Sequence, residues 1–237
     1  VSSDKKVGAV SNDTDDNTVG MYNGFTEGGT EFYLPALYKG AGGWSTEIWI
    51  QATGEVPAGT KAYLAFRDRQ GNQTGTTKDV TMTSQSTIMV SPDDYGDIPN
   101  GWAGGVVITS TEDVAAIGRI TNGSITEMYT GFANGDSTIY GPALYKNAGG
   151  WYSGVMVQNV GVNTTTVTID FYDRLGTQTG TYTFTSEFVA KGVQAVNTRN
   201  VSILPDGWAG TAVIKSSTGE PIIAVIDVTN RSAGLGN

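Results

Sequence analysis

The sequence predicts an all-β protein made of two tandem β-sandwich domains, each Ig-like or jelly-roll in type, which arose by duplication. Three observations predict this fold class. The chain repeats itself, its apolar residues alternate with polar ones over short segments, and its 33 Gly residues interrupt any helical period. Together they also predict the domain boundaries.

The repeat is long and well preserved. The stretch "MYNGFTEGGTEFYLPALYKGAGGWSTEIWIQ" begins at Met21, and "MYTGFANGDSTIYGPALYKNAGGWYSGVMVQ" begins at Met128, with 16 of 31 positions identical. Further along, "FRDRQGNQTGT" corresponds to "FYDRLGTQTGT", and "GWAGGVVITS" corresponds to "GWAGTAVIKS". Two copies of one scaffold that differ only in loop length explain this order.

The segments within each copy have the pattern of strands. "STEIWIQATG", "KAYLAFRDRQG", "TTVTIDFYDRLG" and "TYTFTSEF" alternate apolar and polar residues and are bounded by Gly, Asn or Asp. Each copy holds about seven or eight such segments, which is the strand count of a sandwich domain. We therefore expect β-sandwich repeats over residues 16–122 and 123–237.

A short phrase occurs three times, before, between and after the two copies. It reads "VGAVSNDT", "IGRITNGS" and "VIDVTNRS", so that Val10, Ile120 and Val228 correspond. If each sandwich uses one phrase as its closing strand, the first phrase is left over in an N-terminal arm, residues 1–15. Such a strand can pair with an open sheet edge. The predicted assembly strand is Val7, Gly8, Ala9, Val10 and Ser11. Two alternatives are that the arm pairs with its own domain, or that it marks a boundary in a longer array.

Composition excludes several classes of function. The 23 acidic residues exceed the 14 basic ones and give a net charge of −9, which disfavours nucleic acids and anionic membrane surfaces as partners. No apolar run approaches the ~20 residues that a membrane-spanning helix needs, so no membrane insertion is expected. Cys and His are absent, which removes Cys-based and His-based nucleophile systems and ordinary zinc sites. The sequence predicts a protein that is not an enzyme and requires no cofactor. A carboxylate-based hydrolase is the weakest alternative, because no acid pair recurs in both copies.

The series "PALYKNAGGWYSGVMVQN", "DFYDRLG", "LPDGWAGTAVIKS" and "IIAVIDVTN" resembles a repeat family of large exported bacterial cell-surface proteins. In that family a P-x-x-x-K-x-x-x-G-W stretch ending in V-Q-N precedes a G-S-A-V-V strand and a closing P-I-x-A-x-V-N. This chain departs from the pattern at Gly105 and Thr211, where the family has Ser, and it keeps only "PIIA" of the closure. The resemblance covers residues 20–230 and implies a non-catalytic β-sandwich module at the cell surface, with no implied ligand.

Aromatic residues supply a second candidate function, carbohydrate binding. Trp44, Trp102, Trp151 and Trp208 occupy equivalent places in both copies and are typical of scaffold. Trp49 has no aromatic counterpart, and strand alternation places it with Ser45, Glu47 and Gln51 opposite the apolar residues. Trp49 is therefore the candidate ligand-binding aromatic, with scaffold packing as its alternative. Loop tyrosines that could add to such a surface are Tyr22, Tyr38, Tyr129 and Tyr145.

Two acidic clusters are candidate calcium sites, because hard cations bind several oxygen ligands. The first, "NDTDDN", contains Asp13, Asp15 and Asp16, and the second, "SPDDYGD", contains Asp93, Asp94 and Asp97. Neither has the spacing of an EF-hand, and solvated loops are the alternative interpretation. Calcium bound to the first cluster would order the arm.

Six N-x-S/T triplets are candidate N-glycosylation sites. Chance and turn capping are the alternatives in a Thr-rich chain. The six are Asn12, Asn72, Asn122, Asn163, Asn200 and Asn230. Together these features predict an extracellular structural protein that assembles with itself into a surface filament or surface layer, head to tail through the arm. The alternative function is a carbohydrate-binding or adhesive module whose partners are glycans or the cell surface.

Overall fold

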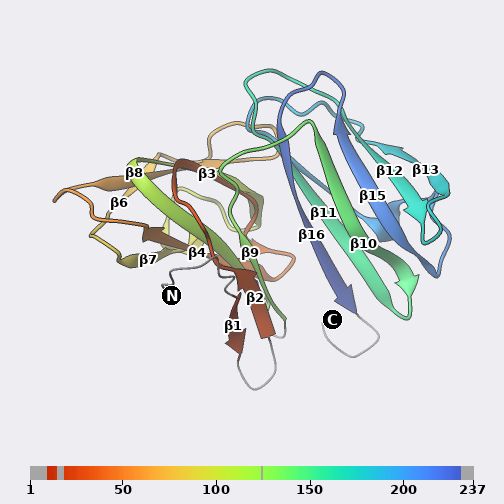
Figure 1. The fold of residues 1–237 in the computed structure, drawn as a ribbon, viewed down its shortest axis with the longest axis horizontal. Coiled ribbons are helices and arrows are strands. Elements are labelled where there is room, and N and C mark those ends of the chain that lie inside the picture. The colour runs from red at the N-terminus through yellow and green to blue at the C-terminus, as the bar shows by residue number, and fades with distance from the viewer. Residues whose placement is uncertain (1–9, 15–18, 124, 231–237) are drawn as a thin grey trace. The chain divides into compact units, whose positions relative to one another are not determined.

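A computed structural model describes residues 10–14, 19–123 and 125–230. It confirms the predicted fold class, because nearly all regular structure is antiparallel β-sheet arranged as a two-domain sandwich-like fold (Figure 1). The first compact unit comprises residues up to Phe66 and Gln73–Ala133, and the second comprises Arg67–Asn72 and residues from Asn134 onward. Among the described residues, no helix is long and apolar enough to cross a membrane.

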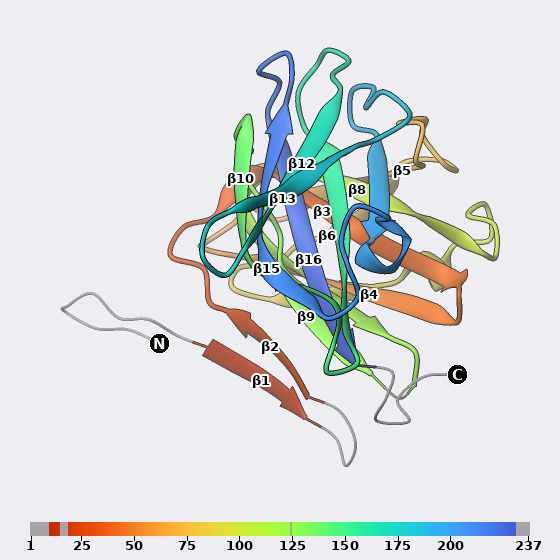
Figure 2. The ribbon, with the colours of Figure 1, turned by 90° about the vertical axis from the view of Figure 1, so that its right-hand side faces the viewer.

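The first unit contains strands β1 to β9 and a short 3-10 helix, η1 (Pro92–Asp94), between β7 and β8. The strands are β1 (Val10–Thr14), β2 (Val19–Asn23), β3 (Gly29–Ala41), β4 (Trp44–Ala52), β5 (Lys61–Arg67), β6 (Lys78–Thr81), β7 (Thr87–Val90), β8 (Trp102–Thr121) and β9 (Thr126–Thr130). The larger sheet has the order β6-β5-β8-β3-β4-β7, with additional pairings of β8 to β4 and to β9. A separate hairpin joins β1 and β2, which lie side by side in Figure 2.

The long strand β8 connects the two layers of this sandwich. Its first half pairs with β3 through Trp102–Thr109, and its second half pairs with β4 through Val114–Thr121. Apolar side chains that alternate along these strands meet between the layers, and Leu34, Ile48 and Phe66 are fully buried there. Burial of this alternating set fixes the register of the strands, because a slip by one residue would turn every side chain to the other face.

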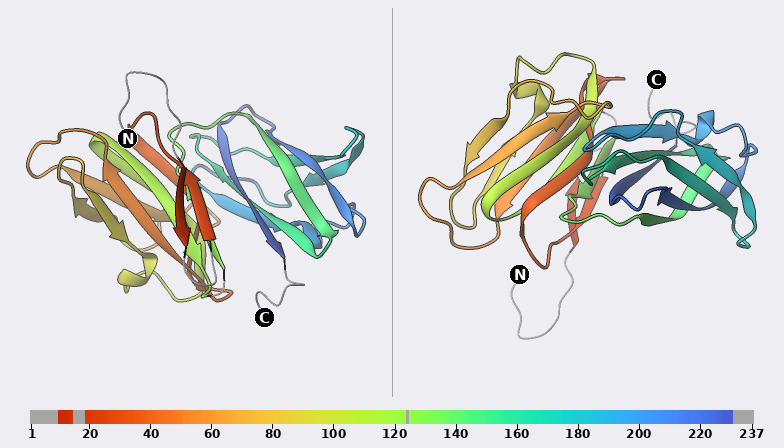
Figure 3. Two further views of the ribbon diagram at one scale, coloured as in Figure 1. Left: turned by 60° about the horizontal axis from the view of Figure 1, so that its bottom comes forward. Right: turned by 90° about the horizontal axis from the view of Figure 1, so that it is seen from above.

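The second unit repeats the design with separate strands in place of β8. It also contains a short 3-10 helix, η2 (Thr198–Asn200). Its strands are β10 (Thr138–Ala148), β11 (Trp151–Asn159), β12 (Val167–Asp173), β13 (Gln178–Thr183), β14 (Val193–Asn197), β15 (Trp208–Ser216) and β16 (Ile222–Asn230). The sheet has the order β13-β12-β15-β10-β11-β14, and β16 pairs with β11. The strands of each unit can also be followed in Figure 3.

A turn separates β15 from β16 where β8 runs without interruption. Gly219 has a φ of +81°, which favours glycine, and Pro221 has no N–H to give to a ladder. The corresponding stretch of β8 contains Thr111 and Asp113, and neither residue breaks the strand. One strand of the first repeat therefore becomes two in the second.

The division between the units falls later than the predicted boundary at residues 122 and 123. By sequence β9 opens the second copy, yet it pairs with β8 along Ile117–Thr121, so it belongs to the sheet of the first unit. Gly131 N–H then donates to Ala116 carbonyl oxygen at 2.7 Å, and Phe132 exchanges two backbone hydrogen bonds with Tyr33. The structural boundary therefore lies between Ala133 and Asn134.

Candidate functional site

Each of the three copies of the repeated phrase has a strand in its described part. Ile117–Thr121 is the end of β8, Val225–Asn230 is the end of β16, and Val10–Thr14 is β1. Of the predicted assembly strand, Val10 pairs with Asn23 and Ser11 with Tyr22, whereas Val7, Gly8 and Ala9 lie outside the described residues. The described part of the arm thus pairs with its own chain.

The hairpin of β1 and β2 resembles the hairpin of the β8 end and β9. Both pairs are antiparallel, and β2 (VGMYN) corresponds in sequence to β9 (TEMYT). In the second hairpin Ile117 faces Thr130, and in the first Val10 faces Asn23, which is the counterpart of Thr130. Alignment of the phrases instead matches Ile117 with Val7. Strand β1 therefore pairs with β2 three residues away from the register that the phrase has beside β9.

The strand β9 closes one side of the first sandwich through a tyrosine. A bulge in β3 between Leu34 and Leu37 interrupts its ladder with β8. Tyr129 Oη donates to Ala36 carbonyl oxygen at 2.9 Å and accepts from Ala36 N–H at 3.2 Å, so the tyrosine pairs both backbone groups of this bulge. Burial raises the pKa of Tyr129 well above its usual range, so the phenol keeps the proton that it donates.

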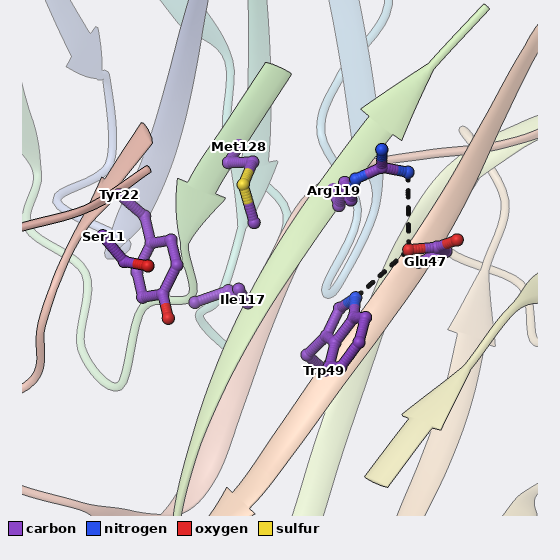
Figure 4. A pocket seen from close by; sticks show the side chains of 7 residues that line it. All are labelled: Ser11, Tyr22, Glu47, Trp49, Ile117, Arg119 and Met128. Carbon is purple, nitrogen blue, oxygen red and sulfur yellow. Dashed lines mark hydrogen bonds and ion pairs between the residues drawn. The ribbon is translucent and has the colours of Figure 1, made fainter. Parts of the chain in front are cut away.

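A groove of about 470 Å³ lies on the outer face of the first unit (Figure 4). Trp49, Glu47 and Arg119 form one side, Tyr22 and Ser11 form the other, and Ile117 and Met128 lie between them. Trp49 Nε1 donates to Glu47 Oε2 at 3.2 Å, and Arg119 forms an ion pair with the same carboxylate at 3.5 Å. Trp49 is 38% exposed, so an indole face and a charged pair are available together at one surface.

Two of the four tryptophans that both copies share have a scaffold role. Trp102 and Trp208 are buried, and each donates its Nε1 proton at 3.1 Å, to Thr74 and Thr179 respectively. The ring of each packs edge-on against a Phe, at centroid distances of 5.9 Å and 5.6 Å. By contrast Trp151 is 42% exposed. The four tyrosines expected in loops lie in strands, and Tyr22, Tyr38 and Tyr145 are half-buried.

Two of the three acidic side chains of the second cluster form hydrogen bonds within the protein. Lys78 Nζ lies 2.6 Å from both carboxylate oxygens of Asp97, and Thr76 N–H donates to Asp97 Oδ2 at 2.8 Å. These hydrogen bonds, with that of Lys78 first, hold the pKa of Asp97 far below its usual range. Asp94 accepts from Ser91 N–H at 2.8 Å in a capping box of η1, and Asp93 is exposed.

The first acidic cluster is only partly described. Asp15 and Asp16 lie outside the described residues, and only the backbone of Asp13 is described, in β1. Within residues 10–14, 19–123 and 125–230, no three acidic side chains are placed to hold a metal ion. Calcium binding by either cluster stays a prediction.

The candidate glycosylation sites fall in two groups. Asn72, Asn163 and Asn200 are exposed, whereas Asn122 and Asn230 are half-buried at the seam phrases. Asn163 Nδ2, the atom that a glycan would modify, donates to Glu220 Oε1 at 2.7 Å, and Asn230 Nδ2 donates to Gly149 carbonyl oxygen at 3.3 Å. Asn12 lies in β1. Asn200 is the last residue of η2, and Asn72 Nδ2 donates to Asp68 Oδ2 at 3.3 Å.

Sequence reasoning missed the role of β9 and of Tyr129. The signal was present, because "MYTGF" and "MYNGF" are the first shared motif of the two copies, yet neither alternation nor spacing showed which sheet this motif joins. A comparison of the chain with protein-family models and with curated proteins found no match.

Proposed function

We propose that this protein is an extracellular structural subunit that assembles with itself into a surface filament or surface layer. Assembly is head to tail, by β-strand addition of the N-terminal segment that contains the arm and β2. The observation that carries the proposal is the pairing of β9 with β8, because the chain already joins its two sequence repeats by adding a strand from one to the sheet of the other. The hairpin of β1 and β2 is a second copy of that joining element.

Light scattering after size-exclusion chromatography, with negative-stain microscopy, tests this proposal over a range of protein concentrations. The intact chain should form concentration-dependent linear assemblies, and a variant lacking residues 1–23 should remain monomeric. That variant keeps Phe25, which packs against the core of the first unit, so near-UV circular dichroism should show that it is folded. An intact chain that is monomeric at every concentration would contradict the proposal. The same measurements with a chelator added test whether calcium controls assembly.

A second candidate function is carbohydrate binding at the groove of Trp49. The observation that favours it is an exposed indole beside the Glu47–Arg119 pair, since a sugar ring stacks on an aromatic face while its hydroxyls bond to charged side chains. A glycan screen of the intact chain should then give hits that Trp49→Ala abolishes and that Trp151→Ala retains. No difference between these two variants would remove the candidate.

A further inference from the structure

The outer edge of β16 differs in exposure from the corresponding edge of β8. In the first unit β9 pairs with β8, and Ile120 is 2% exposed. In the second unit the counterpart of Ile120, Val228, is 36% exposed, and no described strand pairs with this edge of β16 beyond the bridge between Asp136 and Ile222. The second unit therefore presents the edge that β9 covers in the first.

The neighbouring strand shows the same difference. Tyr33 in β3 is 6% exposed where Phe132 bonds to its backbone, whereas its counterpart Tyr140 in β10 is 75% exposed. Pro35 and Ala36 are buried, and their counterparts Pro142 and Ala143 are exposed. Both strands carry the same bulge at this place. Tyr129 pairs with the bulge in β3, whereas the bulge in β10 is open to solvent.

The chain contains a strand whose sequence matches the one that would cover this edge. β2 and the two residues after it read "VGMYNGF", and β9 with its next two residues reads "TEMYTGF". Tyr22 is the counterpart of Tyr129, and Gly24 is the counterpart of Gly131, which bonds to Ala116, whereas Phe25 packs against the core of its own unit. β8 and β9 are consecutive in the chain, whereas the whole first unit separates β2 from β16, so we assign the adding β2 to another copy.

We infer that β2 of one copy adds to the open edge of β16 in a second copy, in the register that β9 has with β8, and that β1 covers the same side of β2 until this happens. This inference rests on the proposed function and names the two surfaces that join. The register of β9 and β8 then places Val225 opposite Asn23 and Asp227 opposite Met21, and it brings Tyr22 to the bulge at Ala143.

The role of β1 follows from its sequence and its register. β1 carries the same phrase as β16, so it can occupy the edge of β2 that β16 would take. It pairs three residues away from the register of the β8 phrase, however, because Met21 lies nine positions after Asn12, whereas Met128 lies six positions after Asn122. No short loop connects β16 to β2, so β16 can pair with β2 in the register that β8 has with β9. Replacement of β1 by β16 at this edge of β2 then favours assembly.

The two edges differ, among other positions, at Gly118. A Cβ added at Gly118 would lie 2.6 Å from the ring of Tyr129, and the second unit has Ile226 there. In return, Leu34 of the first unit is replaced by Gly141, and the Ile226 side chain extends over Gly141. The large apolar side chain is therefore on β3 in the first unit and on β16 in the second. Because Ile226 has a Cβ at this place, the ring of Tyr22 must shift from the position that the ring of Tyr129 has in the first unit.

Disulfide cross-linking tests the register, since the wild-type chain has no Cys. A Val225→Cys chain is mixed with an Asn23→Cys chain and oxidised, and the matched control mixes Val225→Cys with Met21→Cys. A shift of two residues moves the Cα atoms apart by about 7 Å, which a disulfide cannot span without backbone movement. The first mixture should give at least about tenfold more heterodimer than the second.

Two deletions test the role of β1. Removal of residues 1–15 exposes the edge of β2 that β1 covers and should strengthen self-association at least about tenfold, because β1 then no longer competes with β16 for that edge. Removal of residues 1–23 should abolish it. If removal of residues 1–15 alone abolishes self-association, the arm is the adding strand and the inference is wrong.

A surface substitution tests the acceptor edge. Tyr140→Glu should weaken self-association, while Leu175→Glu, which changes a 92% exposed residue elsewhere in the second unit, should not. Self-association without the register-specific cross-link would overturn this inference and leave the proposed function standing. Absence of self-association at every concentration would overturn both.

Discussion

At the scale of single residues, the duplicated core depends on one tryptophan in each unit. Trp208 is buried against Phe171 and donates to Thr179. Trp208→Phe should lower the free energy of unfolding by about 1–2 kcal/mol through loss of the hydrogen bond and some packing. Trp208→Ala should cost about 3–5 kcal/mol. Urea unfolding measures both, and Trp49→Ala, at the exposed groove, should stay within about 0.5 kcal/mol of wild type.

The pairing of Asp97 with Lys78 predicts a dependence of stability on pH. The hydrogen bonds of Asp97 lower its pKa in the folded state below the ordinary 3.8. A lowered folded pKa stabilises the protein above the unfolded pKa, and this contribution is lost as the pH falls through the folded pKa. The melting temperature of Asp97→Asn should therefore fall less than that of wild type between about pH 4 and pH 2.

The control for this prediction is Asp93→Asn, which changes an exposed carboxylate in the nearby helix η1. Its melting temperature should follow that of the wild type over the whole range. Equal acid sensitivity of Asp97→Asn and wild type would show that the ion pair does not contribute. The contact is partly exposed, with Asp97 38% accessible, so added salt should reduce the difference.

At the scale of elements, Tyr129 and Tyr22 are matched residues with different predicted roles. Tyr129→Phe removes the phenol that pairs with both backbone groups of Ala36. Leaving a buried N–H and C=O unpaired should destabilise the first unit by about 1–3 kcal/mol. Tyr22→Phe should leave the monomer's stability unchanged and weaken self-association. Chemical denaturation and light scattering separate the two effects, and a loss of monomer stability in Tyr22→Phe would contradict the assignment.

The sequence predicted most elements because the pattern of each strand is local. Alternation along Trp44–Ala52 showed which side of β4 faces the core, and the structure has Ile48 and Ile50 fully buried. The turn residues also acted locally, as Asp68 accepts from two backbone N–H groups of its own hairpin. Partner choice is not local. Nothing in "MYTGF" indicates that this segment pairs with the strand before it, so the sequence predicts a boundary at residue 122.

The candidate site was predictable only in part for the same reason. Alternation placed Trp49 with Glu47 on the outer face of β4, where the two side chains bond. The other half of the groove comes from Tyr22 and Met128, which lie in β2 and β9. These residues approach Trp49 because of non-local strand pairing, and composition or spacing carries no information on that pairing.

At the scale of the whole molecule, the division into units makes a prediction about fragments. Residues 1–133 contain β9, which supplies Tyr129 and covers the edge of the first sandwich, whereas residues 1–122 do not. The longer fragment should be more stable by at least about 2 kcal/mol, the cost of leaving the bulge and the edge unpaired. Denaturant unfolding of the two purified fragments measures the difference.

The second unit supplies the matched control, because β9 belongs to the other sheet. Residues 123–237 and 134–237 should unfold with equal free energies, since the extra segment adds nothing to a sandwich whose own strands begin at Thr138. A large difference in the free energy of unfolding within this pair, with none between residues 1–122 and 1–133, would show that β9 belongs to the second sandwich. In that case the pairing of β9 with β8 could no longer serve as the model for a joint between copies, and the inference drawn for β2 and β16 would fail with it.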